Sequence, residues 1–182
     1  LKAVVIGEGV EEIGKNAFEG SAIESVTIPS TVQTIGKYAF ASTANLKDVT
    51  IPSNVTAIGE YTFEESGIET LTYASSADLP RQFTRNCLNL KSVVFTDDCK
   101  IETIDNDYVF YGCTALERVV LPKTLTTAKK SALFNGCTSL KYLEADCEAE
   151  FAATTFSNKG LETVVLSDKV KSIAFSNNAN LK

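Results

Sequence analysis

The sequence predicts a solenoid of the α/β class, a right-handed stack of about eight coils with a short parallel sheet along one side. Three observations predict this fold. One pattern recurs every 20 to 26 residues through all 182 residues. Apolar residues alternate at the start of each recurrence, and one phenylalanine follows later in it. A unit this short cannot bury its apolar face alone, so neighbouring units must stack.

Each unit opens with an aliphatic residue. The openings are Leu1, Ile23, Leu46, Ile68, Leu90, Leu116, Leu140 and Leu161, and Leu181 begins a further unit. We therefore expect residues 1–182 to be a single solenoid with units starting at 1, 23, 46, 68, 90, 116, 140 and 161. Because the sequence starts and stops inside a repeat, we also expect it to be a fragment of a longer protein.

The first part of each unit is predicted to be a strand. Positions 4 and 6 are apolar in nearly every unit, as in Val26 and Ile28, and a period of two is typical of a strand with one buried face. Proline follows at Pro29, Pro52 and Pro122, and it ends the strand because it lacks a backbone donor. Successive strands should pair in parallel, and nearly all such crossovers are right-handed.

The recurring phenylalanine is interpreted as core rather than as a ligand site. One ring per coil would stack into a continuous aromatic spine on the side away from the strands. Its expected members are Phe18, Phe40, Phe63, Phe83, Phe110, Phe134, Phe156 and Phe175.

The segments IESVTIPSTVQTIGKYAFASTAN and LKDVTIPSNVTAIGEYTFEESG resemble the BspA-type leucine-rich repeat of bacterial surface antigens. The resemblance implies a secreted or surface-anchored protein that uses its repeats to hold host proteins or neighbouring cells, and it brings no catalytic residues. The fourth unit lacks the IP and IG pairs, the fifth has an insertion near residues 97–100, and the seventh and eighth are short. These coils should be the least regular.

Two ladders follow from the alignment of the units. Position 2 alternates in sign, which predicts a chain of ion pairs that fixes the stacking: Lys2, Glu24, Lys47, Glu69, Lys91, Glu117, Lys141, Glu162 and Lys182. Three positions before an opening residue stand Cys87, Cys113, Cys137, Asn158 and Asn178. We expect these cysteines to be buried donors to a carbonyl of the adjacent coil, with a thiol metal site as the weaker alternative. The roles of Cys99 and Cys147 stay open.

Composition narrows the function classes. The net charge of −6 and the lack of a basic run disfavour nucleic acid as a partner, and no apolar stretch is long enough for membrane insertion. Histidine is absent, and we expect no enzyme activity, no metal and no cofactor. The acidic residues between Asp97 and Asp107 could bind Ca²⁺, but a solvated loop is the favoured interpretation.

The candidate ligand-binding residues are Arg118, Tyr142, Glu144 and Asp146, which should lie together on the exposed face of the sixth and seventh strands. Tyrosine and arginine are enriched at binding hot spots. The predicted function is an extracellular or cell-surface module that binds a protein or a glycan of a host or neighbouring cell. A structural spacer within a larger surface protein is the alternative. The uncapped ends also predict end-to-end self-association.

Overall fold

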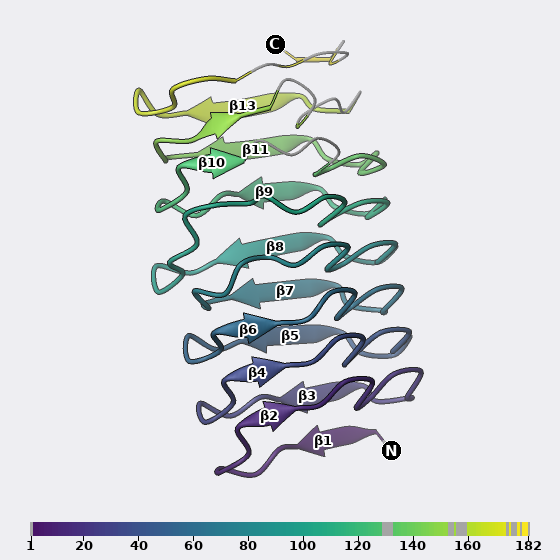
Figure 1. The fold of residues 1–182 in the computed structure, drawn as a ribbon. Helices are drawn as coiled ribbons and strands as arrows, with labels where there is room; N and C mark the ends of the chain where they lie inside the picture. Colours follow the sequence, from purple (N-terminus) through teal and green to yellow (C-terminus); the bar gives the residue numbers. More distant parts are fainter. Residues whose placement is uncertain are drawn as a thin grey trace.

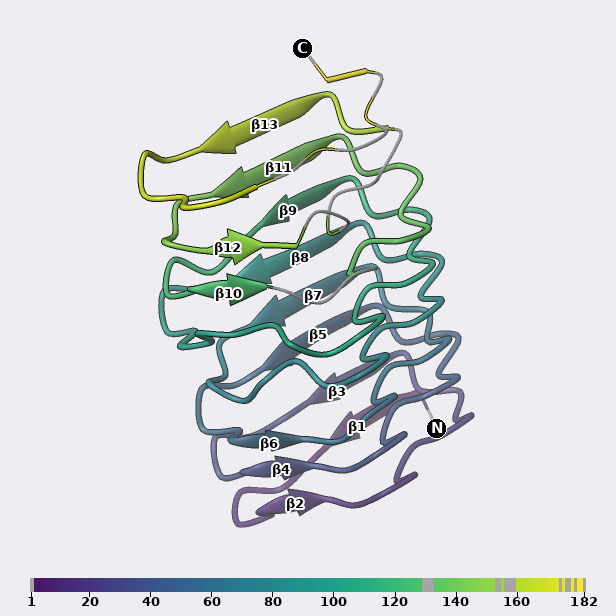
Figure 2. The ribbon, with the colours of Figure 1, turned by 45° about the horizontal axis from the view of Figure 1, so that its top comes forward.

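The computed structural model describes residues 2–128, 133–152, 155, 160–173, 175, 178, 180 and 181. These residues form a single stack of coils, with the N-terminus at one end and the C-terminus at the other (Figure 1). Long strands lie on one side of the stack, which we name the front face, and shorter strands lie on the return limb, which we name the return face (Figure 2). All paired strands are parallel.

The front face carries one strand from each of eight units. In stacking order they are β1 (Ala3–Val5), β3 (Ser25–Thr27), β5 (Asp48–Ile51), β7 (Thr70–Tyr73), β8 (Ser92–Phe95), β9 (Arg118–Val120), β11 (Tyr142–Ala145) and β13 (Thr163–Leu166). The last six form a continuous sheet, and β1 pairs with β3. From β1 to β13 the chain makes about seven turns, so the expected eight coils were one too many.

The return face carries shorter strands in two groups. The first group is β2 (Glu12–Ile13), β4 (Thr34–Ile35) and β6 (Ala57–Ile58), and the second is β10 (Thr127–Ala128) and β12 (Glu150–Phe151). Between the groups, a single bridge joins Thr103 to Thr127. The interruption falls in the fourth and fifth units, which depart from the repeat as the sequence predicted.

The pairing of front strands confirms the predicted alignment of the units. Position 4 of each unit pairs with position 4 of the next, so that Val49 lies beside Leu71, which lies beside Val93. The same correspondence continues through Val119 and Leu143. Apolar alternation therefore predicted both the strands and their stacking order.

The predicted solenoid with a parallel sheet is confirmed, but its α/β label does not hold, because the described residues contain strands and turns but no helix. The backbone gives the reason. In each of five successive coils, two residues four positions apart have positive φ: Asn16 and Gly20, Tyr38 and Ser42, Tyr61 and Glu65, Gln82 and Asn86, and Tyr108 and Gly112. A right-handed helix cannot continue through a left-handed residue, so the return limb folds as a series of turns.

The core contains the predicted aromatic spine, but the spine is interrupted. Phe18, Phe40 and Phe63 stack with ring centroids 5.3 Å apart, and a second stack joins Phe110 to Phe134 at 5.4 Å. Phe83 instead meets Phe63 edge-on, at an interplanar angle of 72°.

The backbone explains the edge-on ring. The amide of Phe40 donates to the carbonyl of Thr62, the residue before Phe63. The amide of Phe63 donates to the carbonyl of Phe83 itself, so Thr84 occupies the expected backbone position of the phenylalanine. The eighth expected ring, Phe175, is partly buried, and Phe156 lies outside the described residues.

The charge ladder forms ion pairs at several steps. Glu69 bridges Lys47 at 3.1 Å and Lys91 at 2.7 Å, whereas Lys2 pairs with Glu24 at 3.4 Å. A further pair joins Lys141 to Glu162 at 3.6 Å, and Lys182 lies outside the described residues. Hydrogen bonds from both lysines, first from Lys91, hold the pKa of Glu69 below its ordinary value.

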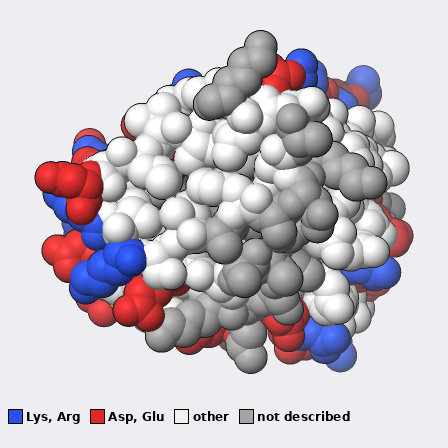
Figure 3. Space-filling view, turned by 90° about the horizontal axis from the view of Figure 1, so that it is seen from above, with Lys and Arg blue, Asp and Glu red and all other residues white. Residues whose placement is uncertain are grey.

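The two ends of the stack leave core side chains partly uncovered. Val4 and Ile6 at the first coil, and Val164 and Ile173 at the last, pack against the core but are only partly buried. Viewed from the C-terminal end, the charged side chains that can be seen lie at the rim, and uncharged residues occupy much of the area inside it (Figure 3). Self-association of the chain through these partly uncovered ends stays a prediction.

Candidate binding face

Three of the four predicted binding residues form one network on the front face. Arg118 on β9 and Tyr142 on β11 are paired positions of adjacent parallel strands. The Arg118 guanidinium lies over the Tyr142 ring, 4.2 Å from its centroid. Glu144, two residues along β11, accepts hydrogen bonds from the Arg118 guanidinium at 3.1 Å and from the Tyr142 hydroxyl at 2.9 Å. Strand alternation explains the arrangement, because Val119 and Leu143 between them point into the core.

The electrostatics of this network keep the tyrosine neutral. The hydrogen bond to Glu144 is the main reason that the pKa of Tyr142 is raised above its usual value, with burial as the second cause. A tyrosine is neutral at physiological pH in any case, and this shift favours the neutral hydroxyl further. The arginine covers one face of the ring and the glutamate accepts from its hydroxyl, so both the ring and the hydroxyl of Tyr142 have partners on the sheet.

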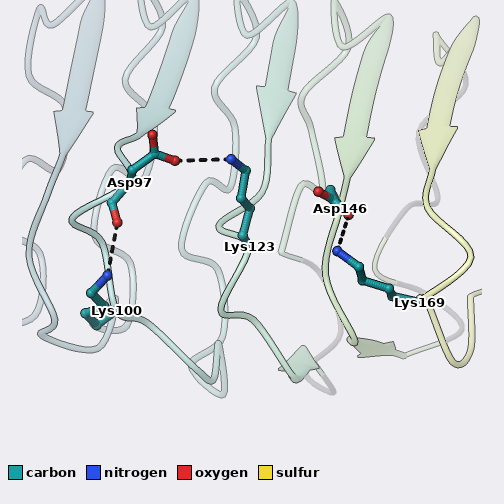
Figure 4. Close-up of polar contacts among 5 residues, drawn as sticks. All are labelled: Asp97, Lys100, Lys123, Asp146 and Lys169. Carbon is teal, nitrogen blue, oxygen red and sulfur yellow. Dashed lines mark hydrogen bonds and ion pairs between the residues drawn. The ribbon is translucent and has the colours of Figure 1, made fainter.

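Asp146 belongs to a different contact. It follows the end of β11, and its carboxylate accepts from the Lys169 ammonium at 3.0 Å, which comes from the turn after β13 (Figure 4). This hydrogen bond is the largest cause of a lowered pKa of Asp146. The sequence placed Asp146 near Arg118, but the structure pairs the aspartate with the next coil instead.

Valines surround the network on the front face. Val94 on β8, Val120 on β9, Glu144 on β11 and Val165 on β13 are consecutive partners across the sheet. Val94 is 46% exposed and Val165 is 45% exposed. The front face between β8 and β13 thus combines exposed apolar area with a tyrosine and an arginine that contact each other. We name this surface the β8–β13 face.

A cleft of about 120 Å³ adjoins this face at the carboxyl ends of β8, β9 and β11. Its lining includes Phe95, Val120 and Pro122, together with the carboxylates of Asp97, Glu144 and Asp146. The Lys123 ammonium binds Asp97 at 3.2 Å across neighbouring turns (Figure 4). Sequence reasoning missed this cleft. A signal was present in Asp97, Lys123, Asp146 and Lys169, which all lie just beyond the end of a strand.

The fifth-coil insertion falls partly where the sequence placed it. The Cys99 amide donates to the Thr96 carbonyl in the fifth coil, and the Leu125 amide donates to the Pro122 carbonyl in the sixth. These two turns are therefore equivalent, with Cys99 aligned with Leu125. The return limbs instead pair Thr103 with Thr127 and so align Ile101 with Leu125. Two extra residues therefore lie between the turn and the return limb. Among the residues that the structure describes, no group of three His, Cys, Asp or Glu side chains is placed to hold a metal ion.

The three-cysteine ladder has the predicted geometry. Cys87, Cys113 and Cys137 are fully buried, and their thiols donate to the carbonyls of Phe63, Thr84 and Phe110 on the preceding coils, at 2.8, 3.0 and 3.0 Å. The ladder extends beyond cysteine, because Ser66 lies one coil before Cys87 with its hydroxyl 3.3 Å from the thiol.

Cys99 and Cys147 are also buried, at the turns that follow β8 and β11. All five cysteines are free thiols, and burial is the main cause of the raised pKa of Cys87, Cys99 and Cys147. Among the described residues there is no helix long and apolar enough to cross a membrane.

Comparison with known proteins identifies the family of the repeat. The family of BspA type leucine-rich repeat regions, in six copies, matches residues 1–83 and 78–182. A search of curated protein sequences finds no match.

Two solved structures share the fold. A leucine-rich repeat protein of T. pallidum has 21% identity and a TM-score of 0.57, over 99% of this chain and 78% of that protein. A leucine-rich repeat protein of Bacteroides ovatus has 22% identity and a TM-score of 0.55, over 100% of this chain and 59% of that protein. The chain therefore spans little more than half the length of the second protein. With the family match across both halves, it belongs to the BspA-type leucine-rich repeat family.

Proposed function

We propose that this chain is a protein-binding module of a bacterial surface protein and that its β8–β13 face makes the contact. The observation that carries the proposal is the network in which the Arg118 guanidinium covers the Tyr142 ring while Glu144 binds both side chains. The surface location is part of the proposal, and it is supported by the family match, since BspA-type repeats are associated with surface antigens.

The physical argument concerns the cost of ordering a surface on binding. A flexible side chain loses about 0.5–1.5 kcal/mol of conformational freedom when a partner immobilises it. Tyr142 already has partners at both its ring and its hydroxyl in the free protein, which lowers that cost. The surrounding valines, among them Val94 and Val165, supply apolar area that a partner can cover. Tyrosine and arginine are enriched at binding hot spots, and the valines would form the surrounding area that excludes water.

A spacer within a larger surface protein is the second candidate. It is favoured by the regularity of the first four coils, where the front face offers mainly short polar side chains such as Ser25, Thr27 and Thr50. A spacer would require no defined contact surface, so its stability and length would matter and its outward residues would not. The two candidates therefore differ in what substitution on the β8–β13 face should do.

The test is a binding measurement with matched variants. The chain is immobilised and exposed to purified host extracellular proteins, and any that bind are titrated against Arg118→Ala and Tyr142→Ala. Thr27→Ala, on the regular part of the same face, is the control. Under the proposal, the first two variants lose about 1–3 kcal/mol of binding free energy and the control loses almost none. Equal affinity for all three variants would exclude the β8–β13 face, and absence of any protein ligand would favour the spacer.

A further inference from the structure

The cleft beside the β8–β13 face has a composition that selects one kind of side chain. It lies where β8, β9 and β11 end and the chain turns toward the return limb. Phe95, Val120 and Pro122 supply apolar contacts, and Phe95 and Val120 are only partly buried. Asp97, Glu144 and Asp146 supply carboxylates, while Lys123 is the one cation among the lining residues. The lining is therefore apolar in part and formally negative.

The volume of the cleft limits what can enter it. The cleft measures about 120 Å³. Sites for whole small molecules usually measure about 300–1,000 Å³. The cleft is thus too small for a complete cofactor or a sugar chain, but it has room for the end of one side chain from a partner.

We infer that this cleft receives an arginine side chain of a protein partner; the existence of such a partner rests on the function proposed above. A guanidinium is planar, carries its charge at every physiological pH, and can bind carboxylates through paired N–H groups. It is also weakly hydrated and stacks on aromatic rings, so the Phe95 ring favours it over an ammonium. The aliphatic stem of the arginine would lie along Val120.

The lysines already present do not close the cleft. The ion pair between Lys123 and Asp97 is highly exposed, with 70% and 92% of the two side chains accessible, and exposed pairs contribute little to stability. Lys123 can therefore move aside and leave Asp97 for the incoming guanidinium. On the opposite wall, Lys169 pairs with Asp146 through side chains that are also about half exposed, so this lysine can move aside in the same way. Glu144 accepts hydrogen bonds from Arg118 and Tyr142.

The experiment uses three blocked amino acids of similar length as probes. N-acetyl-arginine methylamide is the test ligand, the citrulline derivative is its neutral counterpart, and the lysine derivative carries an ammonium. Each is titrated into the isotope-labelled chain, and amide chemical shifts are followed at Leu121, Lys123 and Asp146. The arginine derivative should saturate these shifts with a dissociation constant on the order of millimolar, as expected for a single side chain. The citrulline derivative should leave them unchanged, and the lysine derivative should bind several-fold more weakly.

Variants separate this site from general attraction to an acidic protein. The double substitution Asp97→Asn with Asp146→Asn should weaken arginine binding by about tenfold or more, equivalent to about 1.4 kcal/mol. Asp48→Asn, an exposed aspartate on β5, is the control and should have no effect. Equal shifts with citrulline or lysine, or undiminished binding by the double variant, would overturn the inference. The titration requires no natural partner, so its outcome is independent of whether the proposed function is correct.

Discussion

Truncation of Phe40 tests whether the stacked rings are a main source of stability. The Phe40 side chain is fully buried, and its ring centroid lies 5.3 Å from those of both Phe18 and Phe63. Replacing a buried phenylalanine with alanine costs about 3–5 kcal/mol, because apolar burial is lost and a cavity remains. Two stacked neighbours, each worth about 0.5–1.5 kcal/mol, place the expected loss for Phe40→Ala in the upper part of that range.

The assay is urea unfolding, followed in parallel by circular dichroism and by tyrosine fluorescence. The chain has six tyrosines and no tryptophan, so tyrosine is its usable intrinsic fluorophore. Coincident curves would show that the stack unfolds as one unit, which a free energy of unfolding requires. Phe40→Leu should lose less than Phe40→Ala, and Leu88→Ala, at a side chain that is 58% exposed, should change stability by about 0.5 kcal/mol or less. A loss below about 1 kcal/mol for Phe40→Ala would refute the assignment of Phe40 to a close-packed spine.

Four further predictions concern other parts of the fold. Glu69→Lys should lower the urea midpoint at low ionic strength and recover in salt, because it replaces a bridge between two lysines with three like charges; a salt-independent loss would contradict this. The pKa of Glu69 is lower in the folded chain than its ordinary value of 4.5, so ionised Glu69 stabilises the fold above pH 4.5 and this stabilisation is lost as pH falls through the folded pKa. In Glu69→Gln, the free energy of unfolding should therefore depend less on pH below 4.5 than in the wild type. Gly67→Ala should cost about 1–3 kcal/mol, since the added Cβ would overlap the Ala44 carbonyl oxygen; wild-type stability would contradict this close approach of the two backbones. Ellman's reagent at pH 8 should label almost none of the five buried cysteines in the folded chain and all of them in denaturant, and rapid native labelling would contradict their burial.

The strands could be predicted because one face of each is buried. A shift by one residue would turn Val49 and Ile51 outward, so apolar alternation alone fixes which residues pair with β7. The return limb carries no such signal. Its left-handed residues include Tyr38 and Tyr61, and tyrosine is not a residue type from which positive φ would be predicted. The turns that replace a helix there could therefore not be predicted, and the α/β label was wrong for this reason.

The shifted ring of the fourth coil shows a second limit of sequence alignment. Phe83 was aligned with the other rings because a phenylalanine recurs once per unit. Backbone hydrogen bonds show that Thr84 takes the expected position, while the Phe83 ring reaches Phe63 from the neighbouring residue. Apolar spacing tolerates this shift because a large ring can fill the same volume from either residue.

The candidate face could be predicted only as far as strand geometry reaches. Arg118 and Tyr142 occupy equivalent positions on consecutive strands, so their contact follows from the alignment of the units. The pairing of Asp146 with Lys169 does not follow, because both residues lie beyond strand ends, where the repeat no longer dictates the path of the chain.

The same reasoning indicates where a repeat protein of this kind can hold a specific partner. Residues at consensus positions, such as Phe40 and Val49, are buried in the core and pack between coils, so they are not available to a partner. Outward positions on the regular coils repeat with the stack, so a partner bound there could slide by one coil at little cost. Arg118 and Tyr142 interrupt that repetition on the face, and the cleft near Asp97 and Asp146 interrupts it at the strand ends. A partner that engaged both irregular features would be fixed along the stack as well as across it.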